Sequence, residues 1–122
     1  LFPLSGQASM APTVLLVDKK TNTLTVAHYA NDEYQTIKKY RATIGQVRGD
    51  KWDEGDLKTP EGIYFFNNFL TPPALKPKFG DMAFYITYPN AFDRLSGNTG
   101  FSIMLHATNE PERLKRDYDS EG

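Results

Sequence analysis

Hydrophobic and polar residues alternate along the first third of the chain in a way that predicts two neighbouring strands. Residues 13–17 read Thr-Val-Leu-Leu-Val, a short apolar run that suits a buried strand. Residues 23–29 alternate, and this places Leu24, Val26 and His28 on one face. We therefore expect both segments to form strands.

A third strand is expected over residues 34–44, because this segment is rich in Thr, Tyr and Ile. Its spacing alone also fits a helix. As a strand, it keeps five residues in phase, namely Tyr34, Thr36, Tyr40, Ala42 and Ile44. Turns are expected at residues 18–22 and 31–33, and a polar, glycine-containing loop at residues 45–58.

The second half of the chain predicts three more strands. The turn Thr-Pro-Glu-Gly at residues 59–62 leads into the apolar run 63–66. Residues 82–88 alternate strongly. Residues 101–105 alternate in the same way, so we expect a central strand there that presents His106 at its end, facing a groove.

One helix and one irregular segment complete the expected elements. Residues 71–80 contain three prolines, and we expect no regular structure there. The best helix candidate follows Thr108 or Asn109, either of which can cap it, and runs over residues 112–118. Pro111 suits the first turn of such a helix.

Many short strands with one short helix predict an all-β fold, either a sandwich or a distorted barrel. We assign residues 13–122 to one domain. Residues 1–12 are too short and too polar for a signal peptide and lack its basic start, so we interpret them as a linker from a larger protein.

Charge and cysteine content narrow the classes of partner and site. The 14 basic and 15 acidic residues nearly cancel, so nothing argues for nucleic acid or an anionic membrane as a partner. No apolar run approaches the roughly 20 residues of a membrane-spanning helix. The 122 residues contain no cysteine, which excludes disulfides and thiolate metal sites within them.

His106 is the first candidate for chemistry. On a strand, it shares a face with Ser102 and Met104, opposite the apolar residues Phe101, Ile103 and Leu105. A histidine at a strand end, aimed away from the apolar face, is placed to act as the base for a nucleophilic thiol. The alternative is a structural or surface histidine.

Other polar and aromatic clusters favour structural interpretations. The acidic loop holds Asp50, Asp53, Glu54 and Asp56, but its spacing does not match a calcium-binding loop. His28 has no second ligand at metal-binding spacing. Asp93 and Arg94 can pair or contact a substrate carboxylate, although a local turn network is the simpler interpretation for each. The aromatics suit a sugar platform, but their strand spacing favours core; they are Tyr64, Phe65, Phe66, Phe69, Phe84 and Tyr85.

Four motifs occur in a fixed order. They are Thr-Pro-Glu-Gly at 59–62, Tyr-Pro-Asn at 88–90 with Gly-Asn-Thr-Gly at 97–100, the strand into His106, and Ser-Glu-Gly at 120–122. Together they resemble the catalytic domain of bacterial L,D-transpeptidases, over roughly residues 13–122. One departure is Ala107, because the family usually has glycine after this histidine.

The resemblance implies an enzyme that remodels peptidoglycan through a cysteine nucleophile placed directly after the Ser-x-Gly motif. His106 would be the general base, and backbone N–H groups near Gly122 would hold the oxyanion. Tyr88 and Ser120 become the candidates for substrate binding. The implied substrates are peptidoglycan stem tetrapeptides, the implied location is periplasmic or extracytoplasmic, and no metal or organic cofactor is implied.

Because no thiol is present, we expect these 122 residues by themselves to be inactive, truncated just before the nucleophile. The rival hypothesis is a non-catalytic peptidoglycan-binding or interaction domain of the same fold, and the residue encoded after Gly122 discriminates the two. An unrelated adhesion module would need four ordered motifs to match by chance. A chain that ends at Gly122 is also expected to leave a strand edge unpaired, and hence to self-associate or to be completed by a second segment.

Overall fold

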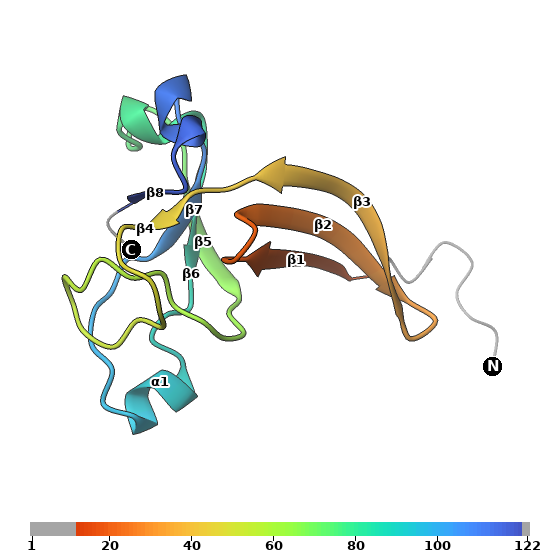
Figure 1. The fold of residues 1–122 in the computed structure, drawn as a ribbon, viewed down its shortest axis with the longest axis horizontal. Coiled ribbons are helices and arrows are strands. Elements are labelled where there is room, and N and C mark those ends of the chain that lie inside the picture. The colour runs from red at the N-terminus through yellow and green to blue at the C-terminus, as the bar shows by residue number, and fades with distance from the viewer. Residues whose placement is uncertain (1–11, 121–122) are drawn as a thin grey trace. The chain divides into compact units, whose positions relative to one another are not determined.

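The computed structural model describes residues 12–120, most of whose regular structure is β-strand (Figure 1). These residues fall into two compact units, one that ends at Ala42 and one that begins at Thr43. The predicted all-β class is confirmed, because the described strands form two three-stranded antiparallel sheets and one small parallel pair, with one short α-helix. Among the described residues, no helix has the length and apolar character needed to cross a membrane.

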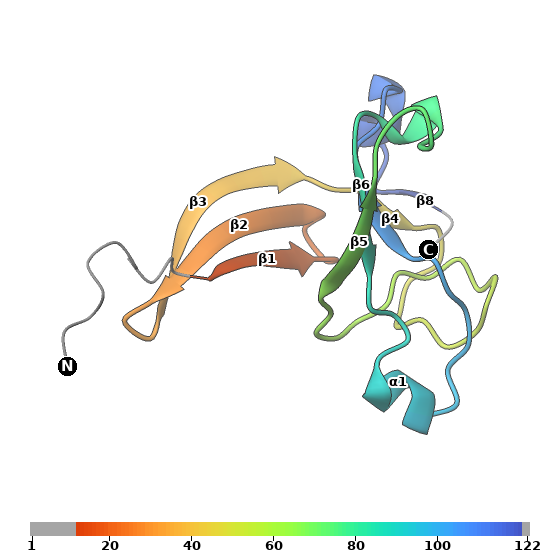
Figure 2. The ribbon, with the colours of Figure 1, turned by 180° about the vertical axis from the view of Figure 1, so that it is seen from behind.

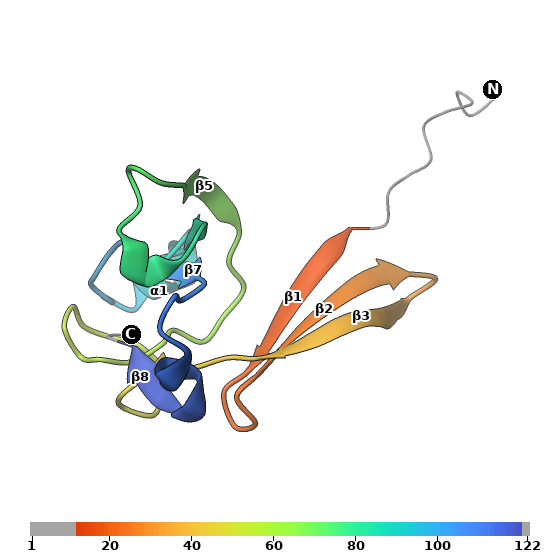
Figure 3. The ribbon, with the colours of Figure 1, turned by 90° about the horizontal axis from the view of Figure 1, so that it is seen from above.

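The first unit is a three-stranded antiparallel sheet with the strand order β1-β2-β3. Its strands are β1 (Thr13–Asp18), β2 (Thr23–Ala30) and β3 (Glu33–Arg41). They lie side by side in chain order and curve together (Figure 1; Figure 3). The strands predicted from residues 13–17 and 23–29 are therefore confirmed.

Two tight turns connect these strands. Asn31 and Asp32 both have positive φ, at 54° and 59°, which is the conformation of a two-residue hairpin turn that matches the twist of its strands. In the other turn, one carboxylate oxygen of Asp18 accepts hydrogen bonds from the N–H groups of Lys20 and Thr21. Leu24 and Ala27 of the central strand β2 are buried.

The single long strand expected over residues 34–44 is only partly correct. The strand ends at Arg41, and a separate strand, β4 (Ile44–Gly45), follows. The pairing register shifts between Val26 and Ala27 of β2, which leaves one extra residue in β3. Tyr34 and Thr36 therefore lie on the opposite face from Tyr40, because a bulge reverses the alternation that the sequence pattern assumes.

The second unit contains two small sheets (Figure 2). One is antiparallel with the order β5-β6-β7, formed by Phe66–Leu70, Ala83–Ile86 and Met104–His106. The other pairs β4 in parallel with β8 (Tyr118–Ser120). The second sheet therefore joins the start of this unit to the segment that carries Ser120.

The strand expected at residues 63–66 begins only at Phe66. Before Phe66, one backbone bond continues the pairing, from the N–H of Thr87 to the Phe65 carbonyl over 2.9 Å, and other bonds involve side chains. The N–H of Phe65 donates to the Thr87 hydroxyl, 3.0 Å away, and the side-chain amide of Asn90 donates to the Ile63 carbonyl, 3.2 Å away. Side-chain bonds therefore replace part of the ladder that the apolar pattern predicts.

The central strand expected at residues 101–105 is also shorter and placed differently. Strand β7 starts at Met104, and within the described residues it lies at the edge of its sheet, next to β6. Ser102 has a positive φ of 58° and Gly100 a φ of 111°, so the backbone cannot extend as a strand before Ile103. His106 nevertheless ends the strand, as predicted.

The helices differ from the single helix that was expected. The α-helix is α1 (Ala91–Leu95). Asn90 is its N-cap, and Asn90 and Asp93 together form a capping box. The expected helix after Pro111 is a 3₁₀-helix, η2 (Pro111–Lys115), with Glu110 at its N-cap, and β8 follows it. A second 3₁₀-helix, η1 (Pro77–Phe79), lies in the segment expected to be irregular, because Pro77 suits the first position of a helical turn.

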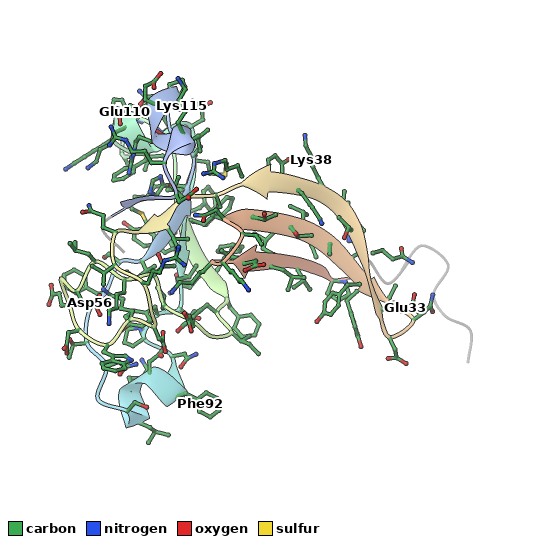
Figure 4. All side chains as sticks on the ribbon, viewed as in Figure 1. Glu33, Lys38, Asp56, Phe92, Glu110 and Lys115 are labelled. Atoms are coloured by element: carbon green, nitrogen blue, oxygen red, sulfur yellow. The ribbon has the colours of Figure 1, made fainter. Side chains whose placement is uncertain are left out.

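None of the six aromatic residues expected in the core is fully buried; Tyr64, Phe84 and Tyr85 are half-buried. Phe65, Phe66 and Phe69 are all exposed, although the rings of Phe66 and Phe84 lie 5.1 Å apart. On α1, the Phe92 side chain is 80% exposed and points away from the ribbon (Figure 4). Strand spacing alone did not distinguish a buried aromatic face from an exposed one.

Candidate catalytic site

His106 is the last residue of β7, and it pairs across the sheet with Ala83 of β6. Ala83 is fully buried, so the strand end that carries His106 is anchored next to the core of the second unit. His106 itself is half-buried. An imidazole in this position is held by the sheet but can still meet a reacting group.

The imidazole has a defined tautomer. Its Nδ1 atom lies 2.6 Å from the carbonyl oxygen of Ala107. A carbonyl oxygen only accepts hydrogen bonds, so Nδ1 must carry the proton and donate it. The other ring nitrogen, Nε2, is then left with a free lone pair and can accept a proton.

The surroundings of His106 favour the neutral imidazole. Burial lowers the pKa of His106 from its ordinary value. The hydrogen bond to Ala107 works in the opposite direction, while the positive charges of Arg113 and Lys78 lower the pKa further. The result is a histidine that is neutral near neutral pH and can therefore accept a proton.

A short segment around η1 packs against this histidine. The Phe79 ring lies 4.6 Å from the imidazole, centroid to centroid, with the two planes at 67°. Gly80 ends η1 with a φ of 74°, and a methyl group on it would lie 2.8 Å from the Cβ of Ala107. Segment 77–80 therefore contacts both the histidine and the residue that follows it.

The second candidate segment is β8, which ends at Ser120. Its backbone pairs in parallel with β4, where Ser120 lies opposite Gly45. The N–H of Gly45 donates to the Thr59 hydroxyl, 2.8 Å away, and any side chain on Gly45 would overlap the Leu57 carbonyl. Thr59 belongs to the Thr-Pro-Glu-Gly motif, which therefore supports the strand next to β8. Gly122 lies outside the described residues.

Tyr88 is buried, at 5% exposure, and its hydroxyl donates to the Thr99 carbonyl over 2.9 Å. Burial, followed by the negative charges of Asp93 and other acidic groups, raises the pKa of Tyr88 to about 12. In this structure Tyr88 joins the Tyr-Pro-Asn motif to the Gly-Asn-Thr-Gly motif. Its role in substrate binding stays a prediction.

Asp93 holds the region between these motifs. Its carboxylate is buried and accepts hydrogen bonds from the Tyr64 hydroxyl, at 3.0 Å, and the N–H of Asn90, at 2.9 Å. The Asn90 side chain accepts in return from the N–H of Asp93, which completes a capping box at the start of α1. The interpretation of Asp93 as part of a local turn network is confirmed.

The acidic loop is organised by Asp56, which is labelled in Figure 4. One carboxylate oxygen accepts from the Lys51 ammonium at 2.8 Å, and the other accepts from the N–H groups of Trp52 and Asp53. Burial works to raise the pKa of Asp56, but the bond from Lys51 and the backbone N–H bonds outweigh it, so this pKa lies well below its usual range. Asp56 is engaged with protein groups, and no cluster of metal-ligating residues occurs within residues 12–120.

The same loop is tied to the Gly-Asn-Thr-Gly turn. The N–H of Glu54 donates to the Thr99 hydroxyl over 2.9 Å, and the N–H of Thr99 donates to the Trp52 carbonyl over 2.8 Å. A cavity of about 380 Å³ lies alongside, lined by residues that include Gln46, Lys51 and Ser102. His106 does not line this cavity, so the groove predicted in front of it stays a prediction.

Sequence patterns missed three residues of this region: Phe79, Gly80 and Lys51. Phe79 and Gly80 follow prolines in a segment without periodicity, and only their place in space reveals the contact with His106 and Ala107. Lys51 appears as one charge in a polar loop, yet its side chain is only 3% exposed. The Asn90–Asp93 capping box is the signal that could have located α1.

Known proteins identify the family. The family model of the YkuD L,D-transpeptidase catalytic domain matches residues 12–122. The chain belongs to the YkuD family. The resemblance inferred from the ordered motifs is therefore confirmed, and so is the fold that it implied.

Individual members of the YkuD family are similar to this chain. The candidate L,D-transpeptidase YafK of Escherichia coli (strain K12) is 32% identical over 98 residues, which cover 79% of this chain and 38% of YafK. The structure of Bd1075 from Bdellovibrio bacteriovorus is 35% identical, with a TM-score of 0.72, and covers 95% of this chain and 40% of that one.

The helical cell shape determining protein Pgp2 from Campylobacter jejuni is 31% identical, with a TM-score of 0.66, and covers 83% of this chain and 37% of Pgp2. This YkuD chain thus spans about two-fifths of the length of the relatives it matches.

Proposed function

We propose that this chain is part of a cysteine-dependent acyl-transfer enzyme that acts on peptidoglycan stem tetrapeptides, as an L,D-transpeptidase or an L,D-carboxypeptidase. Membership of the YkuD family supports the enzyme class, and the cell shape role named for Pgp2 supports a cell wall substrate. The periplasm or another extracytoplasmic site is the location that fits such a substrate. No metal or organic cofactor takes part in this mechanism.

The proposed reaction starts with a cysteine thiol placed directly after Gly122. Nε2 of His106 accepts the thiol proton, and the thiolate attacks the amide carbonyl between the L-centre of the diamino acid and the terminal D-alanine. N–H groups near Gly122 hold the oxyanion. The C–N bond then breaks, and His106 returns its proton to the leaving amine of D-alanine.

The acyl-enzyme that remains is a thioester, and two acceptors can resolve it. Attack by an amine of another stem peptide forms a cross-link, which is transpeptidation. Attack by water releases the shortened peptide, which is carboxypeptidation. Both outcomes use the same base and the same oxyanion site.

The observation that carries this proposal is the hydrogen bond from Nδ1 of His106 to the Ala107 carbonyl. It leaves Nε2 as the proton acceptor. The lowered pKa keeps the imidazole neutral until the thiol gives up its proton.

The second candidate function is a non-catalytic domain that binds peptidoglycan. The 122 residues contain no cysteine, so they are compatible with either candidate. The residue encoded directly after Gly122 separates the two candidates. A cysteine there supports the enzyme, and any other residue supports the binding domain.

The test is release of D-alanine from a purified muropeptide tetrapeptide. We expect the 122 residues alone to release none, and the protein continued through a cysteine after Gly122 to release it. In that protein, His106→Ala should lower the rate by roughly 10²–10⁴-fold. His28→Ala is the matched control, because His28 is the other histidine of the chain.

Near-normal activity of the His106→Ala variant would exclude His106 as the base. The expected self-association, or completion by a second segment, is tested separately by sedimentation of the 122-residue chain. A cooperative, monomeric melt above the usual mesophile range of about 45–65 °C would contradict it.

A further inference from the structure

The 3₁₀-helix η1 contributes the aromatic contact that limits how His106 can turn. Nδ1 of His106 is tied to its own neighbour, Ala107, by a single hydrogen bond. One such bond fixes the tautomer but lets the ring tilt about it. The half-buried Phe79 ring lies 4.6 Å away at a steep angle, which is the T-shaped arrangement that aromatic pairs prefer.

Gly80 explains how Phe79 comes so close. The residue after the histidine is Ala107, and its methyl group occupies the space that a Cβ on Gly80 would need. The N–H of Gly80 donates to the Pro77 carbonyl, which closes η1 immediately beside this contact. Glycine at position 80 therefore makes room for alanine at position 107.

Leu75 anchors the segment from the other side. It is buried, and its N–H donates to the Thr71 carbonyl over 3.0 Å. Beyond Gly80, the carbonyl of Met82 accepts from the N–H of Ala107 over 3.5 Å. The segment from Thr71 to Met82 thus has a buried leucine, an aromatic contact with His106 and a backbone contact with Ala107.

We propose that Phe79 is a positioning residue for His106: its ring, held against the strand through the Gly80–Ala107 contact, keeps the imidazole in the orientation in which Nδ1 is bonded to Ala107 and Nε2 is free for proton transfer. The effect of Phe79 on the orientation of the imidazole is argued from the contacts alone. Its effect on the rate of acyl transfer rests on the proposed function.

Charged groups around the pair also belong to this arrangement. Lys78 of η1 places its ammonium 4.8 Å from the centre of the Phe79 ring, and Arg113 of η2 lies within 4.0 Å of Glu110. Both cations disfavour a protonated His106. The Phe79 ring adds apolar cover, so its removal should expose the imidazole to water and weaken this preference.

The first experiment measures His106 directly, by NMR of the imidazole nitrogens during a pH titration of the full protein. In Phe79→Ala we expect the titration midpoint of His106 to rise toward the ordinary value of about 6.5 and the Nδ1–H tautomer to lose its dominance. Phe79→Tyr keeps the ring and should behave like the wild type. Phe92→Ala is the matched control, since Phe92 is an exposed phenylalanine of the same unit.

A second set of variants tests the support of the ring. Gly80→Ala places a methyl group against Ala107 and strains a backbone at φ 74°, so it should shift the His106 midpoint in the same direction as Phe79→Ala. Adding Ala107→Gly removes the steric part and should restore part of the shift. These substitutions keep the Phe79 ring, so they remain informative if Phe79→Ala does not fold.

Kinetics separate this proposal from the proposed function. In the active protein, Phe79→Ala should lower kcat by roughly 10–100-fold with little change in KM, because a misplaced base affects the transition state most. An unchanged midpoint and tautomer in both Phe79→Ala and the Gly80→Ala variant would overturn the positioning role, whatever the activity. An altered tautomer in a protein whose His106→Ala variant remains active would keep the positioning role and overturn the proposed mechanism.

Discussion

Different kinds of interaction stabilise the interior of each of the two units. In the unit of residues 12–42, long strands pair along most of their length. Several of its side-chain bonds join near neighbours, as between Asp18 and Lys20, while the Asn22 amide donates to the Ala42 carbonyl. In the unit of residues 43–120, strands have two to five described residues. There, single side chains bridge distant loops, as Thr59 does to Gly45 and Tyr64 does to Asp93.

This difference matters because the candidate site lies in the second unit. A backbone ladder spreads its stability over many residues, so no single side chain is essential to it. A loop that depends on one carboxylate is sensitive to its loss, because several buried or backbone donors lose an acceptor at once. We therefore expect substitutions of matched type to have much larger effects in the second unit than in the first.

The largest effect is expected for Asp56→Asn. The substitution leaves the buried Lys51 ammonium without its charged partner, and we expect a loss of roughly 3 kcal/mol in the free energy of unfolding. Chemical denaturation followed by tryptophan fluorescence measures it, because Trp52 lies in the same loop. Asp53→Asn is the matched control, an exposed aspartate of that loop, and an equal loss there would contradict the assigned role of Asp56.

Asp93→Asn should destabilise the protein by about 2 kcal/mol, because the amide turns a donor toward groups that are themselves donors. The structure offers a direct counterpart in the first unit, where the Tyr29 hydroxyl donates to Asp32 over 3.4 Å at an exposed site. Asp32→Asn should cost much less. Comparable losses from both substitutions, in thermal melts, would remove the distinction between the two units.

Acidification should weaken the second unit through His106. Its pKa is lowered in the folded protein, so in the interval below the ordinary value of about 6.5 the unfolded state binds the proton more readily. The free energy of unfolding should therefore fall as the pH falls through that interval. His106→Gln should lack this contribution, and an identical pH dependence in that variant would show that other groups cause it.

The smallest effect is expected in the first unit, and it should be stabilising. Asp32 has a φ of 59° in the hairpin turn after Asn31, a conformation that glycine adopts without strain. Asp32→Gly should raise the free energy of unfolding by about 0.5 kcal/mol. A clear loss of stability would show that the Asp32 carboxylate contributes more than its exposed position suggests.

The same contrast explains what the sequence could predict. Strands β1 and β2 follow the alternation of the sequence, and the predicted segments match them closely. The family and the strand end at His106 were also predicted, because short motifs retain their order in the chain. The bulge in β3 was not predicted, because a single extra residue leaves no mark in the composition.

In the second unit, the periodicity of the sequence was a poor guide where side-chain bonds replace part of the backbone ladder. Residues 63–65 are apolar enough for a strand, yet they bond to Thr87 and Asn90. Ser102 breaks the expected strand through its backbone conformation, which serine seldom adopts. Phe79 could not be linked to His106 from sequence, since a contact between distant segments depends on the path of the whole unit.

The parallel pairing of β4 with β8 has a consequence for the order of events during folding. The strands of the first unit are neighbours in the chain, so each can pair soon after it leaves the ribosome. Strand β4 must wait for Tyr118–Ser120, and a contact between such distant segments closes a long loop at an entropic cost. Strand β8, which ends at Ser120, is thus among the last elements to be placed. The thiol proposed to follow it would meet His106 only once the rest of the domain had formed.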